Sequence, residues 1–172
     1  MIQFDLSGLD RFITRIEKLR DSLPAKLHTI MQRLGDLGVS IAQVSFSSAQ
    51  YDGTNDVKCY TEWDGDKKLN IVANGKAVAF IEFGTGIVYV DDHPKAKEMG
   101  AIRGSYGYHM GRFPTWHYPV YKGTGSNGVY VQTSKGMRIL TEGNPPSYSL
   151  YNTAKELRTK IQSIAEEVLN ND

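Results

Sequence analysis

The chain has 172 residues, of which 23% are charged and 40% hydrophobic, and its formal net charge is +1. These values are typical of one soluble globular domain, and the balanced charge argues against non-specific binding of nucleic acid. The single cysteine, Cys59, excludes an internal disulfide framework and a thiolate metal cage, and no apolar run approaches the ~20 residues of a membrane helix. The first residues lack a signal-peptide pattern, so we expect a protein that is cytosolic when made.

Residues 1–48 carry a helical pattern of apolar side chains. Spacings of three and four residues place one apolar stripe on residues 9–19 and a second on residues 27–41. Ser22 followed by Pro24 is typical of a helix start, so we expect two helices with a break between them. The second stripe also contains Gly35 and Gly38, which predict a kink or the close approach of a neighbouring element.

Residues 57–86 predict a β-hairpin followed by a short helix. Residues 57–63 alternate in polarity, residues 68–73 supply a return strand, and Asp64-Gly65 favours a two-residue turn between them. Residues 77–83 are too short for periodicity to separate helix from strand. We expect a helix there, ended by Gly84 in the left-handed conformation.

Residues 87–146 form a loop-rich insertion, because eleven of the 17 glycines fall between Gly84 and Gly143. One regular element is expected inside it, a short-loop hairpin at residues 129–141. After Pro145-Pro146, residues 147–170 show the clearest amphipathic helix in the chain.

Ser147 is the expected cap of this final helix, whose apolar stripe includes Leu157, Ile161 and Ile164. The order of elements predicts a single α+β domain over residues 1–172. In it, a small antiparallel sheet is packed by long N- and C-terminal helices and interrupted by a long irregular middle insertion.

No complete catalytic or metal-binding pattern is present in the sequence. A metal site would have to combine histidines and carboxylates at spacings that match no ligand pattern, namely His93, His109 and His117 with Asp91, Asp92 or Glu98. Cys59 lies in a predicted strand with no histidine near it in sequence, so we expect a small buried side chain. No phosphate-binding or dinucleotide-binding loop is found. We therefore expect no enzyme activity, no metal and no cofactor.

The middle of the chain concentrates aromatic residues with basic neighbours. The aromatic set comprises Tyr106, Tyr108, Phe113, Trp116, Tyr118 and Tyr121. Aromatics interleaved with arginine and lysine can stack on single-stranded nucleic acid, and the same composition is enriched at protein–protein interfaces. We favour protein contact, because nearby carboxylates dilute the positive charge.

Two segments carry a resemblance to a known family. Residues 77–86 contain Glu82-Phe83-Gly84-Thr85, which resembles the signature of the tail-completion and head–tail joining (neck) proteins of long-tailed, siphovirus-like phages. Residues 143–154 resemble that family's proline-rich approach to a C-terminal helix. The insertion at residues 87–142 is longer than is usual in the family.

The resemblance implies a structural protein of the virion, made in the host cytoplasm and seated at the head–tail junction. Its partners would be the connector or adaptor and tail proteins. It would form a homo-oligomeric ring in the virion, assembled from a protein that is expected to be monomeric in solution, and it would bind neither membrane nor specific nucleic acid. A minor tail or tail-terminator protein is one alternative, and a phage nucleic-acid-binding factor or nuclease is another. In this setting, Glu82 either accepts hydrogen bonds from backbone N–H groups or a basic residue, or faces solvent.

Overall fold

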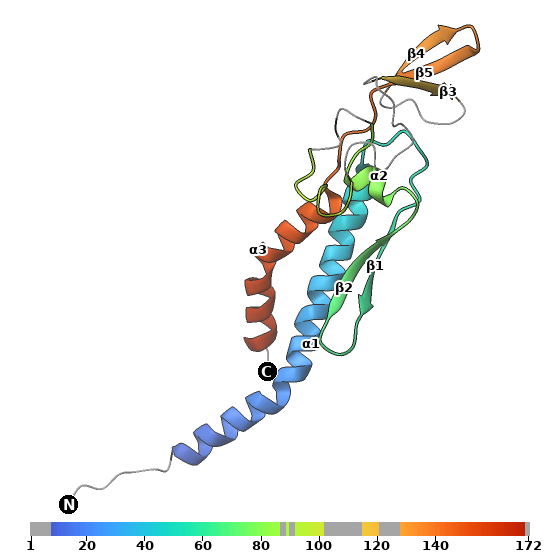
Figure 1. Cartoon of the computed structure of the whole chain (residues 1–172). Coiled ribbons are helices and arrows are strands. Elements are labelled where there is room, and N and C mark those ends of the chain that lie inside the picture. The colour runs from blue at the N-terminus through green and yellow to red at the C-terminus, as the bar shows by residue number, and fades with distance from the viewer. Residues whose placement is uncertain (1–7, 87–88, 90–91, 102–114, 121–127, 171–172) are drawn as a thin grey trace, which may run out of the picture.

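The computed structural model describes residues 8–86, 89, 92–101, 115–120 and 128–170. Its elements, in chain order, are α1 (Leu9–Ser48), β1 (Lys58–Trp63), β2 (Leu69–Asn74), α2 (Val78–Glu82), β3 (Trp116–Pro119), β4 (Gly128–Thr133), β5 (Gly136–Thr141) and α3 (Ser149–Asn170). The predicted α+β class is confirmed, with long helices at both ends of the sequence and antiparallel strands between them (Figure 1). The strands form two sheets, β1–β2 and β3–β5–β4.

The N-terminal helical region is one helix, and the predicted break before Pro24 is wrong. α1 is continuous over 40 residues with Pro24 inside it. Proline removes one helical hydrogen bond and crowds the carbonyl four residues earlier, and a helix can accommodate both effects by bending without ending. Figure 1 shows that α1 bends in its N-terminal half.

α1 is the central element, because α3 packs along one side of it and the β1–β2 hairpin along the other (Figure 1). Gly35 and Gly38 allow this close packing, as predicted. A Cβ atom at Gly35 would lie 2.5 Å from Leu69 Cδ2, and one at Gly38 would lie 2.9 Å from Leu157 Cδ1. A side chain at either position would therefore collide with the hairpin, and at Gly38 with α3 as well.

The β1–β2 hairpin is confirmed, with an antiparallel register in which Trp63 faces Leu69. Its indole stacks on the His28 ring of α1, with ring centroids 4.3 Å apart. The turn is longer than the predicted two residues, because Asp64 and Lys68 close it through a backbone hydrogen bond of 2.8 Å. Gly65 takes the left-handed conformation, with φ +66°, inside this wider turn.

The second sheet, β3–β5–β4, lies at the opposite end of the molecule from the N-terminus (Figure 1). We call it the distal sheet. The predicted hairpin at residues 129–141 is confirmed, with Thr133 facing Gly136 at its tip. β3 was not predicted, because four residues between irregular segments carry too little periodicity to identify a strand.

α3 begins at Ser149 and its apolar stripe is only partly buried. Ile164 is buried, whereas Leu157 is half-buried and Ile161 is 48% exposed. An amphipathic stripe is expected to be buried along its whole length, and this expectation is wrong at Ile161, since α1 and the hairpin leave this part of α3 open. The main apolar core lies at the far end of α1, where Phe46, Val57, Ala77 and Ile81 cluster. No helix in the described part of the chain is both long and apolar enough to cross a membrane.

Candidate functional site

The signature residue Glu82 lies at the last position of α2 and is buried, with 3% of its surface exposed. Its carboxylate accepts hydrogen bonds from two backbone N–H groups in the first turn of α3. Oε2 is 2.8 Å from the nitrogen of Leu150, and Oε1 is 3.0 Å from the nitrogen of Tyr151. The prediction that backbone N–H groups would bond Glu82 is confirmed, and the alternative of a solvent-facing side chain is wrong.

This carboxylate supplies the cap of α3 that the sequence assigns to Ser147. The first N–H groups of a helix have no acceptor within the helix, and the positive end of the helix dipole favours a negative charge there. Glu82 provides both from a distance of 68 residues in sequence. The capping role predicted for Ser147 is wrong, since its hydroxyl lies 2.7 Å from that of Ser149 instead.

His93 completes the environment of Glu82 and is itself buried, at 4% exposed. Its Nδ1 accepts a hydrogen bond of 3.0 Å from the N–H of Lys95, so the ring proton lies on Nε2. That Nε2–H donates to Glu82 Oε1 over 3.2 Å. Both ring nitrogens are thus used in structural hydrogen bonds, which leaves neither to act as a general base.

Three aromatic rings enclose this histidine. Phe83 and Tyr151 approach it edge to face, at centroid distances of 4.6 and 5.5 Å, and Tyr148 stacks on it at 5.1 Å. Tyr148 is held with φ +57°, which is uncommon for a residue other than glycine. Its hydroxyl donates to the backbone carbonyl oxygen of Asp92. Burial, together with the negative charge of the Asp92 side chain, raises the pKa of the Tyr148 hydroxyl above its usual value.

The remaining signature residues bind the segment that leads into α3. Thr85 donates its N–H to the carbonyl oxygen of Asn144 at 2.8 Å, and its hydroxyl accepts from the Asn144 backbone and side-chain nitrogens at 2.8 and 3.0 Å. Gly84 has φ +78°, as predicted for a helix-ending glycine. A Cβ atom there would lie 2.7 Å from the Asn144 oxygen and 2.8 Å from the Pro146 nitrogen.

The two segments that carry the family resemblance therefore meet in space. We call the contact between residues 81–86 and 143–151 the joint. The N–H of Ser147 donates to the Ile81 carbonyl at 2.9 Å, and the close approach of Gly143 to the Thr85 carbonyl leaves no room for a side chain. The chain leaves the joint after Gly86 and returns at Gly143, so the joint closes the base of the insertion that carries the distal sheet.

A second carboxylate cap lies at the start of α2, the helix that carries Glu82 into the joint. Asp56 accepts hydrogen bonds from the N–H groups of Lys76 and Ala77, both at 2.9 Å, at the start of α2. These bonds lower the pKa of Asp56, because they stabilise its charged form. The short helix that carries Glu82 is thus fixed at its beginning as well as at its end.

The residues considered for a metal site are not brought together in the described part of the chain. His93 is bound to Glu82, and His117 lies on β3 in the distal sheet. His109 and Asp91 lie outside the described residues. Among the residues that are described, no three histidine, cysteine, aspartate or glutamate side chains form a cluster suited to a metal ion.

Cys59 lies on β1 and is half-buried, and burial raises the pKa of its thiol. This environment favours the thiol form over the nucleophilic thiolate.

The predicted aromatic contact residues are described only in part. Tyr106, Tyr108, Phe113 and Tyr121 lie outside the described residues, and for Trp116 only the backbone, in β3, is described. Tyr118 faces Ile139 across β3 and β5 and is half-buried. The distal sheet also exposes large apolar side chains that the sequence did not single out, namely Val129, Tyr130, Met137 and Leu140.

Sequence reasoning also missed the role of His93 and Asn144 in the joint. Each lies in an irregular segment, so no periodicity marks it. The available signal for Asn144 was its position between Gly143 and two prolines, where an asparagine commonly bonds neighbouring backbone.

Searches with protein-family models, against curated proteins and against solved structures find no match to this chain.

Proposed function

We propose that this protein is a non-enzymatic assembly subunit of a long-tailed phage, which joins the head connector to the tail as one member of a ring. The observation that carries the proposal is the joint. The two segments that resemble the neck and tail-completion family are 57 or more residues apart in sequence, and they are bonded to each other through Glu82, Thr85 and Asn144. Because the resemblance falls on residues that act together, it is stronger than either segment alone.

The chemistry of the joint supports a structural role for the signature. Glu82 and His93 would be the natural acid–base pair of a hydrolase, but their hydrogen bonds are made to backbone N–H groups and to each other. A general base must instead reach a substrate proton. This arrangement argues against the nuclease alternative at this pair and for a role in holding the insertion in place.

The distal sheet is the surface that we assign to the neighbouring protein of the junction. Tyr130 is 59% exposed on β4, at the end of the molecule farthest from the N-terminus (Figure 1). Val129, which points to the opposite face of the sheet, is 67% exposed. Tyrosine is enriched among the few residues that contribute most of the energy at protein interfaces. With a net charge of +1, the chain has little to attract a phosphate backbone, so a protein partner fits better than nucleic acid.

Deletion of the gene tests this function. We expect the deletion strain to produce filled heads and separate tails, and electron microscopy of the lysate would show them. Complementation by Tyr130→Thr should fail, because loss of one interface aromatic can cost about 2 kcal/mol or more of binding free energy. Gln132→Thr, which places the same residue on the same face of β4, should complement fully. Intact particles in the deletion strain would reject the proposal.

A minor tail or tail-terminator protein is the nearest alternative. Deletion of the gene for such a protein would leave heads joined to tails of abnormal length or composition, so the same micrographs distinguish it from a joining protein.

A further inference from the structure

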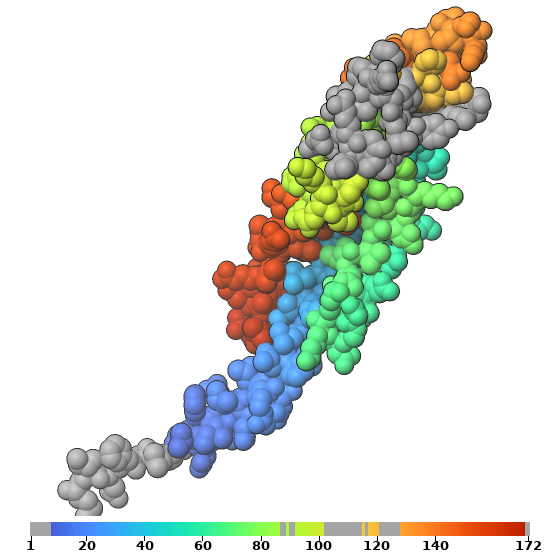
Figure 2. All heavy atoms as spheres, in the orientation of Figure 1, coloured from blue at the N-terminus to red at the C-terminus, as the bar shows by residue number. Residues whose placement is uncertain are grey.

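The N-terminal half of α1 is the part of the molecule that the fold uses least. Ile30 is the first buried residue along the described chain, and before it every residue except the half-buried Ser22 and Lys26 is exposed. Figure 2 shows this half of the helix extending beyond the body as a separate rod. Lys26 bonds the Leu169 carbonyl at 3.0 Å, so α3 ends where the rod begins.

This rod carries an apolar stripe, which we call the ridge. Its members are spaced by three or four residues and are each between 39% and 61% exposed: Leu9, Phe12, Ile13, Ile16, Leu19, Leu23 and Leu27. A helix rises 1.5 Å per residue, so the ridge is about 28 Å long. A solvated helix seldom keeps such a stripe unless another surface covers it.

The ridge continues into an apolar groove on the same face of α1. Met31 and Leu34 form the floor of this groove, Leu69 and Ile71 line it from β2, and Leu157 and Ile161 line it from α3. Its volume is about 220 Å³. Ridge and groove together form one continuous apolar surface along α1, and burial of such surface is what stabilises the core of a protein interface.

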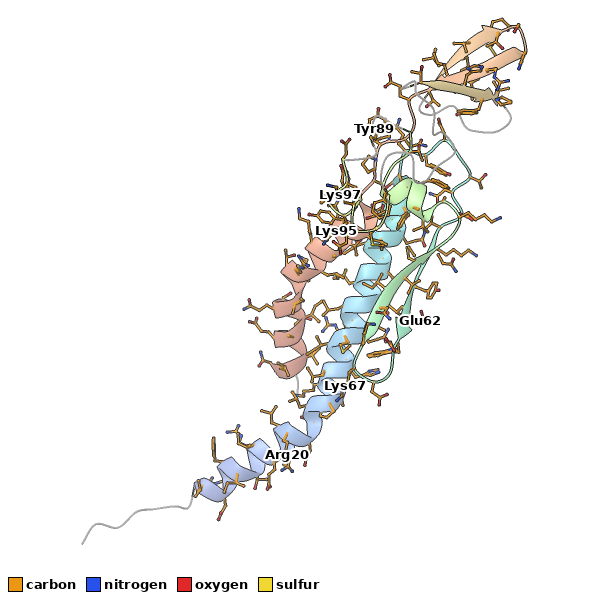
Figure 3. All side chains as sticks on the ribbon, in the orientation of Figure 1. Arg20, Glu62, Lys67, Tyr89, Lys95 and Lys97 are labelled. Atoms are coloured by element: carbon orange, nitrogen blue, oxygen red, sulfur yellow. The ribbon has the colours of Figure 1, made fainter. Side chains whose placement is uncertain are left out.

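The charges beside the ridge identify what covers it. At 3.6 residues per turn, Asp10, Glu17 and Asp21 lie along one edge of the ridge. Arg11 and Arg15 lie along the other edge, and Lys18 lies beyond them on the face opposite the ridge. Arg20, labelled in Figure 3, lies within the ridge between Leu9 and Ile13 in angle, and its guanidinium pairs with Asp21 at 2.8 Å, so Asp10 and Glu17 leave the acidic edge with a net negative charge.

We propose that the ridge is a self-association surface on which α1 of a second copy of this chain packs in parallel. Rotation about an axis along the helices brings the acidic edge of one copy beside the basic edge of the next. Antiparallel packing would place acidic beside acidic and basic beside basic, which is unfavourable. A helix that binds an anionic membrane typically carries basic residues on both sides of its apolar stripe, whereas one edge of the ridge is acidic.

Parallel packing repeated around one axis closes into a ring. The inference thus deepens the proposed function, because it names the surface through which the subunits of the ring meet. It rests on residues of α1 that belong neither to the joint nor to the distal sheet.

A charge exchange between the two edges tests the proposal on the purified full chain. One double variant, Asp10→Lys with Glu17→Lys, makes both edges basic. The other, Arg11→Glu with Arg15→Glu, makes both edges acidic. By sedimentation at about 100 µM, a concentration that detects weak association, we expect the unaltered protein to be oligomeric and each double variant to associate at least tenfold more weakly.

Mixing the two double variants should restore oligomers, because each edge then finds an opposite charge. The variant that carries all four changes should associate alone, and circular dichroism should show the same helix content in every form. A monomeric unaltered protein, double variants that associate normally, or a mixture that stays monomeric would each overturn the proposal. Binding of the monomer to phosphatidylserine vesicles would overturn it in favour of a membrane surface.

These outcomes are separable from the joining function. Sedimentation uses the isolated protein, so its failure leaves the gene-deletion result unaffected. Intact particles in the deletion strain, together with the expected self-association of the purified protein, would instead reject the joining function and support the ridge as a self-association surface.

Discussion

The joint and the ridge differ in whether their side chains find partners within the chain. At the joint, the carboxylate of Glu82 bonds the first turn of α3 and His93, and the hydroxyl of Thr85 bonds Asn144. Along the ridge, large apolar side chains such as Phe12 and Ile16 stay half or more exposed. A polar cluster whose bonds close within the chain serves the fold, whereas exposed apolar surface is stabilised by something outside the chain. The comparison therefore separates what holds this protein together from what attaches it to others.

The largest expected effect is at the joint, on replacement of Glu82. Glu82→Ala removes the acceptor of three donors, one buried and two part-buried, and each buried donor left unpaired costs ~1–3 kcal/mol, so we expect a loss of at least ~3 kcal/mol of unfolding free energy. Denaturant unfolding of the purified protein measures this cost. The control is Glu98→Ala, whose carboxylate pairs with Lys95 at 2.6 Å on the surface, and for which we expect a change within ~0.5 kcal/mol.

Equal losses from Glu82→Ala and Glu98→Ala would show that the joint contributes no more than a surface ion pair. Figure 3 shows Lys95 and Lys97 on the segment that passes beside α3, away from the ridge. The control thus probes the same region of the molecule as Glu82.

A second, smaller effect is expected where the two segments of the joint come closest. Gly143→Ala would place a Cβ atom against the Thr85 carbonyl at a residue with φ +106°. Overpacking and left-handed strain together should lower the unfolding free energy by about 2–4 kcal/mol. Gly100→Ala shares the positive φ, at +71°, but has open space around it, so it should lose only the strain component of ~1–2 kcal/mol.

Thermal unfolding of both glycine variants separates crowding from strain. If the midpoints fall by the same amount, close approach at the joint has no energetic role of its own.

The smallest effect on stability is expected on the ridge. Ile16→Ala should change the unfolding free energy by less than ~0.5 kcal/mol, because Ile16 is 50% exposed and contacts solvent in the isolated chain. Ile30→Ala alters the same residue type on the same helix at a position that is 8% exposed, and it should cost ~2–4 kcal/mol. Measurements are made at low protein concentration, where association does not contribute. A large loss from Ile16→Ala would mean that the ridge packs within its own chain.

The sequence predicted the elements of the fold better than their contacts. Amphipathic periodicity located α1 and α3, and turn chemistry located both hairpins, because these signals are local. The continuity of α1 through Pro24 was missed, since proline bends or ends a helix according to its tertiary surroundings. β3 was missed because its pairing with β5 joins residues about 20 apart with little pattern of their own.

The candidate site was predicted at Glu82 and not at its partners. A carboxylate among apolar residues needs hydrogen-bond donors, and this need can be predicted from the sequence. The donors themselves cannot be predicted, because Leu150 and Tyr151 contribute only backbone N–H groups, which every residue other than proline has. His93 enters through an irregular segment whose path depends on the finished fold.

The closed base of the insertion has a consequence for how such a chain changes over evolutionary time. Because the N–H of Thr85 bonds the carbonyl of Asn144 at 2.8 Å, the segment between them begins and ends at nearly one point. A segment of this kind can be lengthened, shortened or replaced with little change in the entropy of closing it, and without stretching the helices beneath. The same helical base can therefore carry different inserted segments, and a foreign domain whose termini are adjacent could be inserted between Gly86 and Gly143 by design.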